Sequence, residues 1–335
     1  CKIIQNNENM NQPVIDLHCD LLSYLTQQNA GIYKTEDIGC AIPFLKEGQV
    51  KLQIMAIFAA VEATSHQFGF VQSEIFKNLN EEENELYRFE KKHLEHFGTH
   101  ENIGMLASIE SGSAFCNEEM TLKEGFQNLE KIIENVGNVF YISFTHHEGN
   151  RFGGGNYSKA GLKDDGKALV DYLHKRNIAI DFSHTSDALA YDLLDYISKQ
   201  NLNIPIIASH SNYRPVFDHP RNLPDDVAKE IIHQKGLIGL NFVRAFVNPE
   251  KVEALEEHVA HGLSLGGENA ISYGADYFYT KGMLDKSRIP FYFPAHENAD
   301  CYPQINEVFR KQFGAEQTNK ISSENALNFI KKIWN

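Results

Sequence analysis

The chain contains few of the features that assign a protein to a specialised class. Its 335 residues include no apolar run near the roughly 20 residues that a membrane span requires. The first residues do not follow the charged-then-apolar order of a signal peptide, and no stretch rich in Pro, Gly or Ser divides the chain. With 42% hydrophobic residues, the composition predicts an ordinary globular protein.

Cysteine and positive charge are also scarce. Five cysteines, an odd number, are spread over a chain too long to need disulfide cross-links. Lys and Arg number 31 against 45 Asp and Glu, and the net charge of -14 would repel phosphate backbones, so nucleic acid is not an expected partner. The polar tail 1–12 begins with Cys1, which leaves two compartments open. These are the cytoplasm, which is favoured, and the cell envelope, if Cys1 is the lipidated first residue of a bacterial lipoprotein.

What the sequence does contain is a regular alternation of short β-branched apolar runs with longer segments of helical period. This pattern is typical of parallel strands joined by crossover helices. Eight such runs are present, at 14–19, 52–59, 104–109, 139–145, 178–183, 204–209, 237–242 and 271–275. Eight βα units in one unbroken chain predict an α/β protein with a closed (β/α)8 TIM barrel. Residues 13–335 are expected to form one domain with a C-terminal helical extension.

Helical periodicity is clearest between the third and fourth runs. Leu122, Leu129 and Ile132 belong to an apolar series at spacings of three and four, and Thr121 with Glu124 forms a capping box. Further helices are predicted at 82–97, 166–176, 186–198, 224–233 and 249–261.

Titratable residues end six of the eight predicted strands. In a barrel of this type, the chemistry lies at the C-terminal ends of the strands. The residues concerned are His18 and Asp20, Glu110, His146 and His147, Asp181 and His184, His210, and Asp276. A lone histidine at a strand end is more often a hydrogen-bonded structural residue than a ligand. A structural role would scatter such residues, however, so we interpret this set as one joint site.

The first strand illustrates the chemistry that we expect. Residues two apart on a strand point the same way, so Asp16, His18 and Asp20 should face the barrel mouth and Cys19 should face away. Imidazoles and carboxylates form a nitrogen and oxygen ligand set suited to zinc or a similar divalent ion. More ligands converge than one tetrahedral ion needs, and a bridging carboxylate such as Glu110 would let two ions share them.

Three other motifs are weaker signals. Segment 262–266 matches the nucleophile-elbow pattern, but a helix precedes it and a strand follows it, which is the wrong order. The glycines at 153–155 lack the Lys-Ser/Thr of a phosphate loop and are expected in a loop over the site. Asn156-Tyr157-Ser158 is a formal glycosylation sequon.

Taken in order, the motifs are similar to those of a known family. The series His18-x-Asp20, Glu110, Thr145-His146, Asp181-Phe182-Ser183-His184, Ser209-His210-Ser211-Asn212 and Arg221-Asn222-x-x-Asp225-Asp226 resembles the membrane (renal) dipeptidase family, peptidase family M19. The resemblance runs from the first strand to the eighth. It implies a binuclear zinc barrel of the amidohydrolase type. Such an enzyme hydrolyses dipeptides, often with a D-residue at the C-terminal position, by attack of a metal-bridging hydroxide.

The resemblance also implies a role for each matching residue. His18 and Asp20 would hold one zinc ion, His184 and His210 would hold the other, and Glu110 would bridge the two and take part in catalysis. Among the remaining residues, His146 would lie beside the scissile carbonyl and contact the substrate, and Asp276 would transfer protons. Arg221 would bind the C-terminal carboxylate of the substrate, with Asn222 beside it.

Two departures from the family pattern leave the substrate preference open. The family usually continues the strand-eight aspartate as Asp-Phe-Asp-Gly, whereas this chain reads Asp276-Tyr277-Phe278-Tyr279. After the bridging glutamate the family usually has Gly, and here Ser111 intervenes. Neither departure removes an expected metal ligand.

Two alternative functions remain beside the dipeptidase. One is another metal-dependent amidohydrolase, acting on an N-acyl amino acid, a cyclic amide or a β-lactam, and the other is a non-catalytic binding barrel. A carboxylate clamp at Arg221 would separate the first alternative, because it restricts substrates to peptides with a free C-terminus. The expected partners are a small dipeptide and, by analogy with the family, a second copy in a homodimer.

Overall fold

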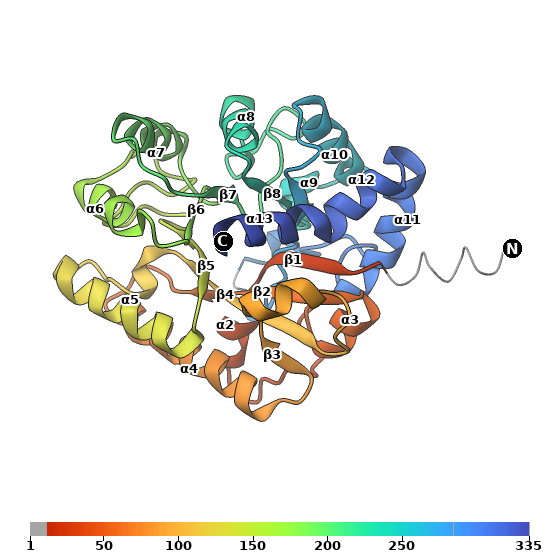
Figure 1. Cartoon of the computed structure of the whole chain (residues 1–335), viewed down its shortest axis with the longest axis horizontal. Helices are drawn as coiled ribbons and strands as arrows, with labels where there is room; N and C mark the ends of the chain where they lie inside the picture. The colour runs from red at the N-terminus through yellow and green to blue at the C-terminus, as the bar shows by residue number, and fades with distance from the viewer. Residues whose placement is uncertain (1–11, 284, 335) are drawn as a thin grey trace, which may run out of the picture.

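A closed ring of parallel strands forms the centre of the molecule (Figure 1). The computed structural model describes residues 12–283 and 285–334, so Cys1 and the rest of segment 1–11 lie outside the described residues. Neighbouring strands pair in the order β2-β1-β9-β8-β7-β6-β5-β4, and the pairing of β2 with β4 closes the ring. The strands of the ring are β1 (Val14–Cys19), β2 (Val50–Phe58), β4 (Ile103–Glu110), β5 (Val139–Ser143), β6 (Ala179–Asp181), β7 (Ile206–Ala208), β8 (Leu237–Leu240) and β9 (Ile271–Tyr273). The predicted (β/α)8 barrel is confirmed.

Helices surround the ring and supply the crossovers between its strands (Figure 1). They include α4 (Ser65–Glu82), α5 (Leu122–Val136), α6 (Asp164–Leu173), α7 (Asp187–Lys199), α8 (Asp225–His233), α10 (Ala254–Ser264) and α11 (Tyr302–Phe313). The capping box of α5 is confirmed, since the Glu124 amide donates to Thr121 Oγ1 at 3.3 Å and the Thr121 amide donates to Glu124 Oε2 at 2.9 Å. Within the described ranges, no helix combines the length and apolar character that crossing a bilayer demands.

Shorter elements fill the loops between these layers. They are α2 (Leu21–Leu25), α3 (Ile42–Glu47), η2 (Gly112–Ala114), α9 (Arg244–Val247), η3 (Lys286–Arg288), η4 (Ala299–Cys301), α12 (Ala315–Asn319) and η5 (Lys320–Glu324). Of these, α2 follows β1, η2 follows β4, and η3 lies in the long segment after β9. All three therefore lie at the end of the barrel where the strands terminate.

One predicted helix, at 82–97, is wrong. The chain leaves α4 at Glu83 in an extended conformation and forms a ninth strand, β3 (Leu86–Arg88), followed by the 3-10 helix η1 (Lys91–His96). The strand β3 pairs with the first residues of β4, Ile103 to Met105, and so occupies the part of that edge that β5 leaves free. Pairing with β4 and burial of Leu86 and Phe89 override the helical preference of the charged residues around them.

The end of the barrel where the strands begin is closed by the C-terminal helix α13 (Asn325–Trp334). Its Ala326, Phe329 and Ile330 are buried in one apolar cluster with residues of the strands, including Ile15 and Leu17 of β1. Figure 1 shows α13 lying across the ring. Apolar packing thus seals this end among the described residues, and a cavity lies at the opposite end, where the strands terminate.

A β-bulge changes the expected alternation along β1. Asp16 pairs with Gln53 and Cys19 pairs with Met55, so β1 advances by three residues over a distance in which β2 advances by two. The prediction that Asp16 faces the barrel mouth with His18 is therefore wrong. The Asp16 carboxylate is fully buried near Tyr302 of α11, and its Oδ1 accepts hydrogen bonds from the amides of Ala275, at 3.0 Å, and His18, at 3.3 Å. It fixes the backbone that carries His18.

Candidate metal centre

The carboxylate of Glu110, the last residue of β4, lies at the centre of the predicted ligands. Its Oε1 is 3.0 Å from His184 Nε2 and 3.4 Å from His210 Nε2, and its Oε2 is 3.5 Å from His18 Nε2. The two oxygens of one carboxylate thus face different histidines. Asp20 completes the second group, with its Oδ2 3.9 Å from His18 Nε2. The structure brings all five predicted metal ligands together at the ends of four strands.

His18 presents Nε2 to this centre because its other ring nitrogen is engaged. The hydroxyl of Tyr141 lies 2.7 Å from His18 Nδ1 and donates its own proton to the carbonyl of Leu17 at 2.9 Å. Because that proton is used, the hydroxyl accepts from His18 and Nδ1 carries the imidazole proton. The lone pair of Nε2 is left free to bind a metal.

His210 and His184 are oriented in the same way by different partners. Ser209 Oγ lies 2.6 Å from His210 Nδ1 and donates to Asp181 Oδ2 at 2.7 Å, so it accepts from the ring. The Asn156 side-chain oxygen lies 3.0 Å from His184 Nδ1 and accepts from it. In metal sites such partners fix the tautomer and orientation of ligating histidines. All three ring Nε2 atoms are therefore acceptors.

A bound cation would satisfy these acceptor atoms better than the hydrogen bonds available within the protein do. The Nε2 atoms of His184 and His210 are 3.1 Å apart, both face Glu110 Oε1, and neither nitrogen carries a proton. Burial lowers the pKa of both imidazoles well below the usual range, so protonation does not relieve the contact. His18 Nε2 and Asp20 Oδ1 are buried without a hydrogen-bond partner in the described part of the chain. Divalent ions would satisfy these atoms.

The carboxyl groups respond to the same crowding. Burial, together with the charge of Glu110, raises the pKa of Asp20 to about 8. Burial also raises the pKa of Glu110 and of Asp276 to about 8. Three carboxylates in one dry site repel one another, and cations are the natural counter-charge. Asp276 belongs to this group because its Oδ1 is 3.7 Å from His18 Nε2.

Two residues of the site have backbone conformations that favour glycine. His184 follows β6 and Asp276 follows β9, each with a φ of 65°. Such conformations cost about 1 to 3 kcal/mol and persist where the surrounding structure enforces them. For Asp276, two hydrogen bonds help to enforce this conformation. Its amide donates to the His18 carbonyl at 3.2 Å, and Asn241 Nδ2 donates to its Oδ2 at 2.8 Å. The strain directs both side chains toward the centre.

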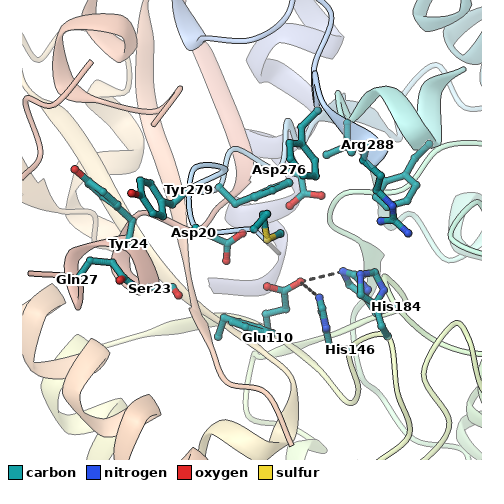
Figure 2. A pocket seen from close by; sticks show the side chains of 18 residues that line it. Asp20, Ser23, Tyr24, Gln27, Glu110, His146, His184, Asp276, Tyr279 and Arg288 are labelled. Carbon is teal, nitrogen blue, oxygen red and sulfur yellow. Dashed lines mark ion pairs between the residues drawn. The ribbon is translucent and has the colours of Figure 1, made fainter. Parts of the chain in front are cut away.

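A cavity of about 420 Å³ opens over the centre, a size within the range of small-ligand sites. Figure 2 shows Glu110, His146, His184, Asp20 and Asp276 facing into it. The predicted residues that line it are Asp20, Glu110, His146, His184 and Asp276. His146 lies on the wall, with its Nε2 3.9 Å from Glu110 Oε1.

Other lining residues were not among the predicted site residues. Ser23 and Tyr24 come from α2 and Gln27 from just beyond it, and Tyr279 and Arg288 come from the segment after β9. His147, which belongs to the predicted set at the strand ends, also lines the cavity, and its Nδ1 donates to the oxygen of Asn156 at 3.1 Å, the same atom that orients His184. The only sequence signal at Asn156 was a glycosylation sequon, yet the side chain is buried.

The two predicted substrate-binding residues Arg221 and Asn222 do not line the cavity. Arg221 is buried beside the metal centre, where its Nη1 donates to Ser211 Oγ at 2.7 Å and its Nη2 donates to the His210 carbonyl at 2.8 Å. Asn222 donates from Nδ2 to the carbonyls of Phe217 and Phe246. In this structure, both side chains hold the backbone around the site.

The two departures from the family pattern have distinct structural outcomes. Ser111 has a φ of 78°, a conformation that glycine adopts at no steric cost. Tyr277 is fully buried and donates to the His296 carbonyl at 3.1 Å, so it belongs to the core. Phe278 and Tyr279 line the cavity. The altered segment thus forms part of the substrate-facing wall.

Comparisons with known proteins give a matching family model and several relatives. The family model described as Membrane dipeptidase (Peptidase family M19) matches residues 7–335. A region of 162 residues is 32% identical to the dipeptidase verJ of Clonostachys rogersoniana and covers 45% of this chain and 40% of verJ. A region of 212 residues is 26% identical to the dipeptidase tcpJ of Claviceps purpurea and covers 61% of this chain and 46% of tcpJ. The chain thus spans less than half the length of these curated relatives.

Solved structures share the fold over nearly the whole chain. A metallo peptidase from Rhodobacter sphaeroides, liganded with a phosphinate mimic of the dipeptide L-Ala-D-Ala, has a TM-score of 0.80 at 17% identity and covers 97% of this chain and 100% of its own. The probable dipeptidase PvdM from Pseudomonas aeruginosa has a TM-score of 0.76 at 13% identity, with coverage of 99% and 98%. At these identities, the likeness is one of fold.

Proposed function

The chain belongs to the membrane dipeptidase family, peptidase family M19, and on that premise we propose that it is a metallo-dipeptidase. Residues 13–335 form its catalytic domain, and its substrates are dipeptides, including those with a D-residue at the C-terminal position. The observation that carries the proposal is the position of Glu110, whose two carboxylate oxygens face different histidine groups, as a residue shared by two metal ions must. The fold shared with a peptidase that binds a mimic of L-Ala-D-Ala supports the substrate class.

The two ions are zinc in this proposal, because neutral imidazoles with carboxylates form the ligand set that zinc prefers. His18 and Asp20 would hold one ion, His184 and His210 would hold the other, and Glu110 would be shared between them. When bound, two such ions supply Lewis-acid chemistry, lowering the pKa of water from 15.7 toward about 7 and polarising a carbonyl.

Asp276 is the proton-transfer group. Its Oδ2 accepts a hydrogen bond from Asn241 and its Oδ1 lies 3.7 Å from His18 Nε2, so the carboxylate is held at the edge of the centre and faces the cavity. Burial raises the pKa of Asp276 to about 8, which suits a group that takes and returns a proton near neutral pH. It accepts the proton of the attacking water and passes it to the leaving amine.

His146 stabilises the charge that develops on the carbonyl oxygen. It lines the cavity next to Glu110, and burial with the neighbouring His147 lowers its pKa well below the usual range. A neutral imidazole donates a hydrogen bond from one nitrogen without bringing a second positive charge. A donor of this kind is typically worth about 3 kcal/mol in the transition state.

One experiment tests the proposal against its two alternatives. Metal content is measured on the purified chain, and kcat/KM is then measured on a panel of L,L- and L,D-dipeptides, an N-acyl amino acid, a cyclic amide and a β-lactam. We expect about two zinc ions per chain, dipeptide hydrolysis, and loss of activity with a chelator that returns with zinc. Activity confined to the other amides would favour a different amidohydrolase, and full metal occupancy without any turnover would favour a binding barrel.

A matched pair of variants ties the result to the centre. Glu110→Gln keeps the size of the side chain but removes the shared charge, so we expect lower metal content and at least a roughly 1,000-fold loss of kcat. Glu119→Gln, at an exposed position in the segment that follows β4, should leave metal content and kcat unchanged. Equal activity of the two variants would contradict the assigned role of Glu110.

A further inference from the structure

The cavity contains a positive charge that the proposed chemistry does not use. Of the side chains that line it in the described part of the chain, Arg288 is the one that is always cationic. The other charged lining groups are Asp20, Glu110 and Asp276, which belong to the metal centre. Figure 2 shows Arg288 on the same side of the cavity as His184, with Tyr24 and Tyr279 on the opposite side.

The guanidinium of Arg288 is positioned but not neutralised. Its Nη2 donates to the hydroxyl of Tyr157 at 3.2 Å, and among the described residues no carboxylate lies within 4.0 Å of it. A guanidinium offers five N–H donors in a planar fork, and a single contact to Tyr157 leaves most of them available. A free fork of this kind matches the two oxygens of a carboxylate.

A chain of contacts connects Arg288 to the metal centre. The Tyr157 ring stacks on His147, with ring centroids 4.9 Å apart and an interplanar angle of 27°. His147 donates to the Asn156 oxygen at 3.1 Å, and that oxygen also orients His184 at 3.0 Å. These contacts fix the position of the guanidinium relative to the metal ligand His184. A substrate that binds to the metal centre and to Arg288 at the same time requires such a fixed distance.

The guanidinium of Arg221, to which the family resemblance assigns the C-terminal carboxylate, is buried beside the metal centre. Its two terminal nitrogens donate to Ser211 and to the His210 carbonyl, its Nε has no partner among the described residues, and its side chain does not line the cavity. These contacts hold the turn that carries His210. Arg288, by contrast, lines the cavity.

We propose that Arg288 binds a carboxylate of the substrate. The inference rests on the proposed dipeptidase function and deepens it, because it assigns the residue that selects an acidic group. Two carboxylates of a dipeptide have the same chemistry, the C-terminal group and the side chain of an acidic residue. Substrates that lack the recognised carboxylate bind less well to the wild type. Loss of the Arg288 guanidinium leaves the metal centre and its reactivity toward these substrates unaffected.

Two pairs of substrates separate these sources. The first pair is a neutral dipeptide and its C-terminal amide, and the second is a dipeptide ending in Glu and the same dipeptide ending in Gln. For each pair, the ratio of kcat/KM is measured with zinc-loaded wild type and with Arg288→Met, which keeps much of the length of the side chain. Lys286→Met is the matched control, since Lys286 is exposed in the same element η3 and does not line the cavity.

We expect Arg288→Met to lower one of the two ratios about tenfold or more, through KM, because it removes a charge-assisted pair. The uncharged member of that pair should keep its kcat/KM within about twofold, and metal content should not change. The affected ratio identifies the carboxylate. Lys286→Met should leave both ratios at the wild-type values.

Unchanged ratios in Arg288→Met, or a wild type that prefers neither carboxylate, would overturn the inference while leaving the dipeptidase standing. If no dipeptide is hydrolysed at all, the proposed function fails, and Arg288 is judged by calorimetric binding of the same peptides to the zinc-loaded chain. Carboxylate-dependent binding that is equal in wild type and Arg288→Met would then overturn the assignment.

Discussion

The two walls of the cavity are built differently. The metal wall consists of Asp20, Glu110 and His184, which line the cavity, together with the buried His18 and His210, which do not; all five end strands or follow them within three residues. The loop wall, formed by Tyr279, Met283 and Arg288, comes from the segment after β9, where Met283 is 41% exposed against 0% for His18 and His210. Buried side chains thus support the metal wall, whereas the loop wall is more exposed.

The partners of each wall differ in the same sense. Every histidine of the metal wall has its second nitrogen on a buried partner, namely Tyr141, Ser209 or Asn156. Among the described residues, the Arg288 side chain makes one hydrogen bond, to the half-exposed Tyr157. A metal ion demands fixed distances, so its ligands need support on all sides, whereas side chains that select among substrates need only reach them. We therefore assign the chemistry to the metal wall and the selection of substrates to the loop wall.

The largest effect that would test this division is the pH dependence of metal binding. In the metal-free protein, burial raises the pKa of Asp20, Glu110 and Asp276 to about 8, so below pH 8 these groups carry protons that a metal ion must displace. Each displaced proton raises the apparent affinity about tenfold per pH unit, so zinc affinity should rise about 100-fold or more from pH 6 to pH 8. Competition with a chromogenic chelator measures it.

The stabilities of the metal-free and the zinc-loaded protein should diverge as the pH rises over the same range. For a carboxyl whose pKa is higher in the folded state, the folded chain binds more protons than the unfolded chain between about pH 4 and pH 8. The metal-free protein therefore loses stability as the pH rises from about 4 to about 8, and the stabilisation by zinc grows. The difference in Tm between zinc-loaded and metal-free protein should be larger at pH 8.5 than at pH 6. A constant difference would contradict the assigned ligands.

A smaller effect is expected from the support behind one ligand. Asn156→Leu removes the acceptor of His184 Nδ1, and loss of such a partner typically weakens metal affinity about 10- to 100-fold. Asn156→Asp is the matched control, because it keeps an oxygen acceptor at the same place and should retain most of the affinity. Isothermal titration with zinc measures both variants. Equal affinity of Asn156→Leu and wild type would show that the metal wall does not depend on its buried partners.

Much of the metal wall could be predicted from the sequence because strand ends are readable. An apolar run that stops at a histidine or carboxylate fixes both the strand and the position of the residue, and a closed barrel brings such residues to one rim. His18, Glu110, His184 and His210 were found in this way. The bulge in β1 was not, because it depends on register against β2 and leaves no mark in the alternation of residues.

The partners behind the ligands and the loop wall were missed for a related reason. Tyr141 reaches His18 across 123 residues of sequence and Asn156 reaches His184 across 28. Such contacts arise only when strands and loops are assembled in three dimensions. Arg288 lies in a segment without periodicity, so no local pattern relates it to the cavity. The strand β3 shows the same limit, since pairing with β4 overrode a helical composition.

The smallest effect should come from the aromatic side of the loop wall. Tyr279 packs against Tyr24, with ring centroids 5.2 Å apart, and both line the cavity. An aromatic contact of this kind is worth about 0.5 to 1.5 kcal/mol, so Tyr279→Ala should change kcat/KM by up to about tenfold. The change should differ between dipeptides with aromatic and with small side chains, since the ring borders the space that these side chains enter.

Metal content decides what that result means for the two walls. Zinc affinity of Tyr279→Ala should equal that of wild type, as should that of Tyr191→Ala, a control at an exposed tyrosine of α7. If Tyr279→Ala lost zinc or affected every dipeptide equally, the loop wall would be supporting the ligands, and the division between the walls would fail. A selective change with full zinc occupancy would instead show that this wall is free to vary while the chemistry beneath it is retained.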